Sequence, residues 1–203
     1  MTLLWERKNP KELIFAGRVP RGLLNMVIIS DYTFVSNGER CSIVVCKERF
    51  HLCPICGAQM SYRDSRKRVC KTYGGETKHL VIRRFKCPCG SHHTELPDCL
   101  CPNKHYEVEV IENVVDEVST PEDLTSENYP CEKTMNRWKQ WFSRNTHQIE
   151  GALKTIDHLV LGSCVRTLKS KYSYTRHFRN MGSGWLSTIS RLIYNCGHRL
   201  DAV

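Results

Sequence analysis

The sequence has no hydrophobic run long enough to cross a membrane. Its longest apolar stretches, residues 23–29 and 43–46, have the length of β-strands, whereas a membrane-spanning helix needs about 18 consecutive apolar residues. The sequence also lacks the apolar core of a secretory signal, because residues 5–12 (WERKNPKE) are mostly charged. We therefore expect a soluble, cytoplasmic protein that does not associate with membranes.

The chain is also short for a large domain. Its 203 residues favour one or two small domains with cores of modest size. Twelve cysteines exceed ordinary usage, yet they are too few for a small secreted scaffold held together by disulfides. Because the cytoplasm is reducing, clustered cysteines there are more often metal ligands than disulfide partners. The cysteine clusters are therefore the first candidates for a functional site.

Two short cysteine motifs have the form of zinc knuckles. Residues 53–57 read CPICG and residues 87–90 read CPCG. In each motif the proline restrains the turn, and the glycine allows the positive φ that directs two sulfurs at one ion. Four thiolates suit tetrahedral Zn²⁺. The predicted ligands are Cys53, Cys56, Cys87 and Cys89.

The residues between the two motifs have the pattern of a β-hairpin. Residues 63–86 are interrupted by the turn sequence YGGE at 73–76, and residues 79–85 (HLVIRRF) form the expected returning strand. Knuckle, hairpin and knuckle in this order are typical of a zinc ribbon. The metal would supply stability that so small a sheet lacks in its own core.

The second motif is one residue shorter than the first, which leaves its ligand set open. Either Cys87 and Cys89 both bind in altered geometry, or His92 or His93 replaces one of them. Cys99 and Cys101 repeat the same spacing, so a second metal or a redox pair is an alternative to a structural role. We expect the other cysteines to be small buried apolar side chains. They are Cys41, Cys46, Cys70, Cys131, Cys164 and Cys196.

Basic residues are nearly absent from one part of the chain. Residues 87–131 contain one Lys or Arg and ten Asp or Glu. By contrast, residues 63–86 contain nine basic and two acidic side chains, and residues 132–203 contain 12 basic and four acidic ones. Two basic blocks of this density favour binding to a polyanion such as nucleic acid. The alternative is that the acidic block neutralises its neighbours within the fold.

Residues 108–118 follow the pattern of an amphipathic helix. Apolar side chains recur at helical spacing up to Val118, so the acidic residues between them are expected on the solvated face. These acidic residues are Glu107, Glu109, Glu112, Asp116 and Glu117. Residues 120–123 (TPED) then carry the start signal of a short helix, and residues 126–130 form a turn.

The next predicted helix has an apolar stripe and a basic face. Its apolar residues are Met135, Trp138, Trp141 and Phe142, and its basic face comprises Lys133, Arg137, Gln140 and Arg144. The order of these elements, a helix, a short helix, a turn and a basic helix, matches a helix-turn-helix module. In such a module the last helix lies in the major groove of DNA. The alternative is a helical hairpin that packs on the ribbon and leaves its basic face in solvent.

The rest of the chain is predicted to be mostly helical. A helical pattern continues through residues 149–160 to Gly162, and a final helix runs from Trp185 to a stop at Gly197. Between them, residues 169–179 interleave basic and aromatic side chains, as in surfaces that bind phosphates and stack bases. Alternatively, those aromatic rings close the core.

We therefore expect an α+β protein, in which a zinc ribbon with a small antiparallel sheet precedes a mostly helical helix-turn-helix region. Four segments are predicted: a strand-rich segment at 1–49, a zinc ribbon at 50–104, a helix-turn-helix at 105–145 and a helical segment at 146–203.

Several motifs resemble a group of small, poorly characterised bacterial proteins related to the N-terminal modules of transposases. The similarity covers roughly residues 50–200 and rests on 53–57, 82–87 (IRRFKC), 92–98 (HHTELPD) and 102–106 (PNKHY). Residues 134–142 resemble the recognition helix of that group, and the helix at Trp185 resembles its C-terminal segment. This resemblance implies DNA binding linked to mobile elements. A transposase nuclease domain would need more chain than remains after the ribbon and the helices.

These observations predict a nonenzymatic, zinc-stabilised protein that binds double-stranded DNA, as a transposase-related accessory factor or a transcriptional regulator. In this hypothesis the hairpin grips phosphates and the basic helix reads base edges. The hairpin contacts are Arg63, Arg66, Lys67, Arg68, Arg83 and Arg84, and the helix contacts are Lys133, Arg137, Gln140 and Arg144. The alternatives are a zinc-ribbon adaptor that binds a protein partner or a second copy of the chain, and a binder of single-stranded nucleic acid or RNA.

Overall fold

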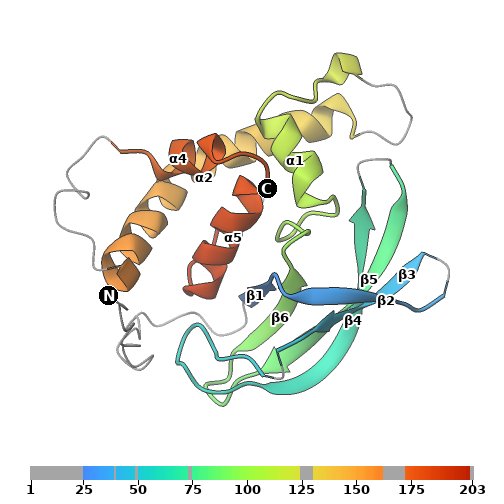
Figure 1. Ribbon diagram of the computed structural model, residues 1–203, viewed down its shortest axis with the longest axis vertical. Helices are drawn as coiled ribbons and strands as arrows, with labels where there is room; N and C mark the ends of the chain where they lie inside the picture. Colours follow the sequence, from blue (N-terminus) through green and yellow to red (C-terminus); the bar gives the residue numbers. More distant parts are fainter. Residues whose placement is uncertain are drawn as a thin grey trace, which may run out of the picture.

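The computed structural model describes residues 25–38, 40–48, 50–72, 75–123, 130–161 and 172–201. In this part of the chain a curled, six-stranded sheet is followed by four α-helices, which confirms the α+β class (Figure 1). The strands are β1 (Asn25–Ile29), β2 (Tyr32–Ser36), β3 (Cys41–Cys46), β4 (Ser61–Lys71), β5 (Thr77–Lys86) and β6 (His92–Pro97). The helices are α1 (Val108–Val115), the 3-10 helix Pro121–Asp123, α2 (Glu132–Leu161), α4 (Tyr174–Asn180) and α5 (Trp185–Asn195).

Strand β5 is the centre of the sheet. The predicted hairpin is present, because β4 pairs antiparallel with β5 along its whole length. On the other side of β5, β3 pairs parallel with the N-terminal half and β6 pairs antiparallel with the C-terminal half. Strand β2 extends the sheet beyond β3, and β1 extends it beyond β6 in parallel. Two strands thus share one side of β5, so that strands from residues 25–46 and from 61–97 form one sheet.

The two faces of the sheet carry different layers. Side chains alternate along a strand, so Leu80 and Ile82 face the helices, where they join a core that includes residues of α1, α2 and α5. Phe85 points to the opposite face and packs with Val27 and Cys53. Both layers meet at β1, whose five residues are all buried. This burial explains why β1 is a continuous apolar run.

Helix α2 is a single helix of 30 residues. The predicted apolar stripe is buried in the core, and it continues through Ile149 and Leu153, as the sequence pattern indicated. Helix α5 lies beside β1 (Figure 1). The Asn195 side chain accepts a hydrogen bond from the Ile28 amide at 2.7 Å and donates one to the Ile28 carbonyl at 2.8 Å. It thereby satisfies backbone groups at an edge of the sheet that would otherwise stay unpaired.

One predicted surface residue of α1 is buried. The Glu112 side chain accepts hydrogen bonds from the amides of Gly184 (2.6 Å) and Leu186 (2.9 Å) at the start of α5, and the residue is 3% exposed. Its expected position on a solvated face is therefore wrong, because the unpaired amides at a helix start need an acceptor. Val118, expected on the apolar face, lies beyond the end of α1 and is 69% exposed.

Further sequence expectations have mixed outcomes. The 3-10 helix begins as predicted, with the Thr120 amide donating to the Asp123 carboxylate at 2.8 Å. Among the cysteines expected to be buried, Cys46 and Cys70 are buried, whereas Cys131 is exposed. Cys164 and most of the turn at 126–130 lie outside the described residues. In the described part of the chain, every helix is too short or too polar to cross a membrane.

Candidate metal centre and cationic pocket

Two tight turns bring the four predicted cysteines together. In the first turn the Gly57 amide donates to the Cys53 carbonyl at 2.8 Å, and Gly57 has φ +70°. In the second the Gly90 amide donates to the Cys87 carbonyl at 2.9 Å, with φ +86° at Gly90. The hydrogen bond in the second turn spans one residue fewer. The shorter motif thus forms a tighter turn and still presents both of its sulfurs.

The sulfur atoms of this cysteine cluster lie within 4.8 Å of one another. Cys56 Sγ is 3.3 Å from Cys87 Sγ, and Cys53 Sγ is 4.0 Å from Cys89 Sγ. A tetrahedral ion with metal–sulfur bonds of about 2.3 Å requires sulfurs about 3.8 Å apart. The four side chains could therefore bind a metal ion with little movement.

Cys53, Cys87 and Cys89 differ in acidity. Burial raises the pKa values of Cys53 and Cys87. Cys89 is exposed, and although desolvation opposes ionisation, hydrogen bonds from Ser91 and the neighbouring thiols lower its pKa to about 6. A metal binds thiolates and displaces their protons. Cys89 thus ionises more readily than Cys53 or Cys87, which need the positive ion to become thiolates.

Of the two histidines left open as ligands, only His93 contacts the cluster. Its Nε2 lies 3.3 Å from Cys53 Sγ, whereas His92 is exposed. Burial lowers the pKa of His93 to about 4, so its ring is neutral at physiological pH. Its Nδ1 has no hydrogen-bond partner among the described residues. A proton on Nε2 would therefore be donated to the sulfur, as in hydrogen bonds that orient metal ligands.

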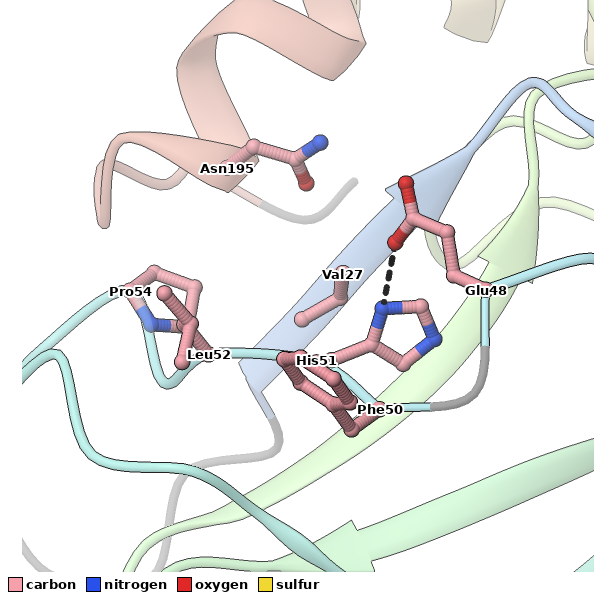
Figure 2. A pocket seen from close by; sticks show the side chains of 7 residues that line it. All are labelled: Val27, Glu48, Phe50, His51, Leu52, Pro54 and Asn195. Atoms are coloured by element: carbon pink, nitrogen blue, oxygen red, sulfur yellow. Dashed lines mark ion pairs between the residues drawn. The ribbon is translucent and has the colours of Figure 1, made fainter. Parts of the chain in front are cut away.

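A second buried cluster lies on the same face of the sheet. His51 Nε2 is 2.5 Å from a Glu95 carboxylate oxygen, and His51 Nδ1 is 3.1 Å from Glu48 (Figure 2). Arg83 also donates to both oxygens of Glu95. Cys46, His51 and Glu95 are close enough to hold an ion, but the Arg83 cation already neutralises the Glu95 carboxylate. We therefore assign this cluster to an ion-pair network.

His51 also forms one wall of a cavity of about 540 Å³ (Figure 2). Most of its other lining is apolar, with Asn195 at one side. The lining residues are Val27, Glu48, Phe50, His51, Leu52, Pro54 and Asn195.

Cys99 and Cys101 do not extend the cysteine cluster. Cys101 is fully buried, and burial raises its pKa to about 12 and that of Cys99 to about 11. Neither belongs to a group of described side chains that could hold a metal ion. Both side chains are thus protonated thiols at physiological pH.

The predicted hairpin contacts divide into three groups. Arg83 pairs with Glu95, and Arg84 donates to Asp64 at 2.6 Å, so both guanidinium groups are engaged within the fold. Arg63 and Lys67 are exposed on β4. The third group, Arg66 and Arg68, is partly buried on the face of the sheet that carries the helices, opposite Ile82 and Leu80.

The four predicted helix contacts lie on α2 and are all exposed: Lys133, Arg137, Gln140 and Arg144. Arg144 donates to the Gln140 side chain at 3.4 Å, and Arg137 donates to Thr134 at 3.2 Å. This basic face therefore extends along the N-terminal half of α2.

A pocket of about 370 Å³ lies where the end of β4, residues 103–106 and the start of α2 meet. We call it the cationic pocket. Its lining residues are Lys71, Asn103, Lys104, His105, Tyr106, Thr134, Arg137 and Trp138. Arg68 of β4 donates to the Lys104 carbonyl at 2.7 Å. The structure thus brings the hairpin and the basic helix, two elements predicted separately, to one place.

Lys104 is a residue that sequence reasoning missed. It is 7% exposed, and its ammonium group lies 4.5 Å from the centre of the Trp141 ring. Burial and the nearby Arg137 guanidinium lower its pKa. One signal was present, because Lys104 is the single basic residue of the acidic block 87–131.

Comparison with known proteins gives one match. A family model described as a domain of unknown function (DUF6431) matches residues 53–138, which is less than half of the chain. The matched region includes the four cysteines, Lys104 and Arg137. No curated protein and no solved structure matches the chain.

Proposed function

We propose that this protein binds double-stranded DNA through the basic face of α2, and that Zn²⁺ held by the four cysteines stabilises the turns on the other face of the sheet. The observation that carries the proposal is the row of exposed side chains at Lys133, Arg137, Gln140 and Arg144, which leads into the cationic pocket. Basic side chains neutralise phosphates, and Arg and Gln can pair with base edges.

The metal part of the proposal rests on the donor set. Four thiols favour Zn²⁺ over the hard ions Mg²⁺ and Ca²⁺, which prefer oxygen ligands. Four protein ligands also close the coordination sphere, as in structural rather than catalytic zinc sites. The ion would connect the turns at 53–57 and 87–90 and so fix them against Val27 and Phe85 of the sheet. We propose no catalysis for this centre.

The helix-turn-helix geometry remains part of the proposal. Helices α1 and α2 pack on each other, with the 3-10 helix between them in sequence. The buried stripe of α2 holds it in place while its basic face stays open to a major groove. A role with mobile elements rests on the resemblance to transposase-related modules.

Burial bears on both alternatives. A single-stranded nucleic acid binder would stack bases on exposed rings at 172–178; Tyr174 is 8% exposed, whereas Tyr172 is 39% exposed, so this segment is buried in part. A protein adaptor that uses the apolar face of α5 would need Trp185, which is 3% exposed. The basic face of α2 has no such obstacle.

The test is the salt dependence of binding to duplexes enriched from random DNA. Each phosphate contact contributes a slope of about −0.9 to log K against log salt. We expect Arg144→Ala to weaken binding about tenfold. It should also make the slope of log K against log salt shallower by about 0.9, the contribution of one phosphate contact. Arg176→Ala removes the same charge from α4 and should change neither. Binding without salt dependence, or an Arg176→Ala effect as large as that of Arg144→Ala, would overturn the proposal.

A further inference from the structure

The cationic pocket combines several positive charges with a lining that, among the residues described, has no acidic side chain. Lys71, Lys104 and Arg137 line it, and no carboxylate is among the lining residues that the structure describes. The ion pairs of the described residues include neither Lys104 nor Arg137. Buried cations are expensive unless a partner compensates their charge. The side chains of Lys104 and Arg137 are thus close to each other without a counter-ion from this part of the chain.

Lys104 is the strongest single indication of a ligand. Its side chain is more than nine-tenths buried, and its ammonium group lies 4.5 Å from the centre of the Trp141 ring. A ring face compensates a buried charge only in part. The like charge of Arg137 adds to the cost of ionising Lys104. An anion in the pocket would relieve both costs together.

The other lining groups indicate the chemistry of this anion. The Thr134 hydroxyl and the Asn103 amide supply neutral hydrogen-bond donors. Several donors around two positive charges match a phosphate monoester, which carries close to two negative charges and three strong acceptor oxygens.

The pocket is larger than a phosphate alone requires. Its volume of about 370 Å³ lies in the range of sites that hold small organic ligands. Tyr106, which is partly buried, supplies the accessible aromatic lining, and the Trp138 ring, 4% exposed, packs edge-on against it with ring centres 4.9 Å apart. Aromatic side chains beside a phosphate site favour a nucleoside as the organic part.

We propose that the cationic pocket binds a nucleoside 5′-phosphate through Lys104 and Arg137. This group occurs both on free mononucleotides and at the 5′ end of a DNA strand. Binding of a strand end rests on the proposed function, whereas binding of a mononucleotide does not.

The first arm of the test uses mononucleotides and the full chain. Calorimetric titration compares adenosine 5′-monophosphate, adenosine and inorganic phosphate. We expect the monophosphate to bind at least about tenfold more tightly than adenosine, because a charged hydrogen-bonded group is worth at least this factor. Lys104→Met keeps the length and packing of the side chain without its charge, and Arg137→Gln removes a charge at the mouth. Each should abolish the preference.

The second arm uses duplexes of one sequence with either 5′-phosphate or 5′-hydroxyl ends. We expect phosphorylated ends to bind about tenfold more tightly, and Lys104→Met and Arg137→Gln to remove this difference. Arg144→Gln is the matched control, since it lies on the same helix outside the pocket. It should weaken both duplexes equally and leave their ratio unchanged.

The outcomes separate the two proposals. The proposed phosphate site is refuted if adenosine and its monophosphate bind equally and the two duplexes also bind equally. This holds even if the protein binds duplex DNA. A monophosphate preference without duplex binding overturns the proposed function and leaves the pocket standing. If Lys104→Met fails to fold, Arg137→Gln decides the result, because Arg137 is exposed. An unchanged preference of that variant for phosphorylated ligands also refutes the inference.

Discussion

The guanidinium group of Arg83 donates two hydrogen bonds to the Glu95 carboxylate, at 2.7 and 2.5 Å, and the Glu95 side chain is completely buried. The same carboxylate contacts His51. Hydrogen bonds from His51 and Arg83 outweigh burial and lower the pKa of Glu95. In the sequence Arg83 belongs to a dense basic block, but in the fold its charge serves an internal pair next to the loop that carries the cysteines.

Arg83→Met should therefore lower the free energy of unfolding. It leaves the buried Glu95 carboxylate without its strongest partner, and breaking such a pair costs about 3–5 kcal/mol. Lys67→Met, which removes an exposed charge from neighbouring β4, should change the unfolding free energy by less than about 0.5 kcal/mol. Urea denaturation of the metal-loaded proteins measures both. Equal stability of the two variants would contradict a structural role for Arg83.

The parts of the fold that the sequence predicted correctly depend on local signals. The hairpin follows from strand patterns on both sides of a glycine turn, and α2 and α5 follow from helical periodicity. The parallel pairing of β1 with β6 joins residues that are far apart in the chain, and no local pattern specifies it. Glu112 was misplaced for the same reason, because its partner amide belongs to Leu186.

The candidate site shows the same limit. The four cysteines were found because turn geometry fixes the spacing of metal ligands. The number of charges in a segment does not show which side chains form ion pairs in the fold. Arg83 and Arg84 could therefore not be distinguished from the exposed Lys67. Lys104 was missed because Arg68, Arg137 and Trp141, the groups around it, come from different segments.

The cysteine cluster predicts a metal requirement. Cys56→Ser should lower the metal content well below the one ion per chain expected for the unmodified protein and reduce its melting temperature, because a structural metal contributes folding free energy directly. Cys131→Ser, which removes an exposed thiol at the start of α2, should retain the ion. Elemental analysis and thermal melts with and without chelator make the comparison. Full metal content in Cys56→Ser would rule out this ligand set.

Substitution of Glu112, at the junction of α1 and α5, should lower the free energy of unfolding. Its two oxygens each accept an amide hydrogen bond, from Gly184 and Leu186. Glu112→Gln keeps the shape of the side chain but retains only one acceptor oxygen, so one amide loses its partner. We expect a loss of about 1–3 kcal/mol in unfolding free energy. Glu109→Gln, on the exposed side of α1, is the control, and a loss of the same size there would refute this explanation.

Glu150 predicts a dependence of stability on pH. Its carboxylate accepts hydrogen bonds from the Ser173 hydroxyl at 2.7 Å and from the Tyr174 and Thr175 amides at 2.9 Å, all at the start of α4. Burial alone would raise its pKa, but these hydrogen bonds lower it below the ordinary value of 4.5. A carboxyl group with a lowered pKa in the folded state contributes stability above its unfolded pKa. That contribution is lost as the pH falls through the folded value.

Glu150→Gln should therefore be less stable than the unmodified protein by about 1 kcal/mol near neutral pH, a value kept small because solvent screens a partly exposed carboxylate. The difference should shrink as the pH falls below 4.5, where both side chains become neutral. Urea unfolding of both proteins over this range measures the difference, so that any acid-induced loss of metal affects the two alike. A difference that stays constant or grows in acid would show that the charge of Glu150 does not hold the start of α4.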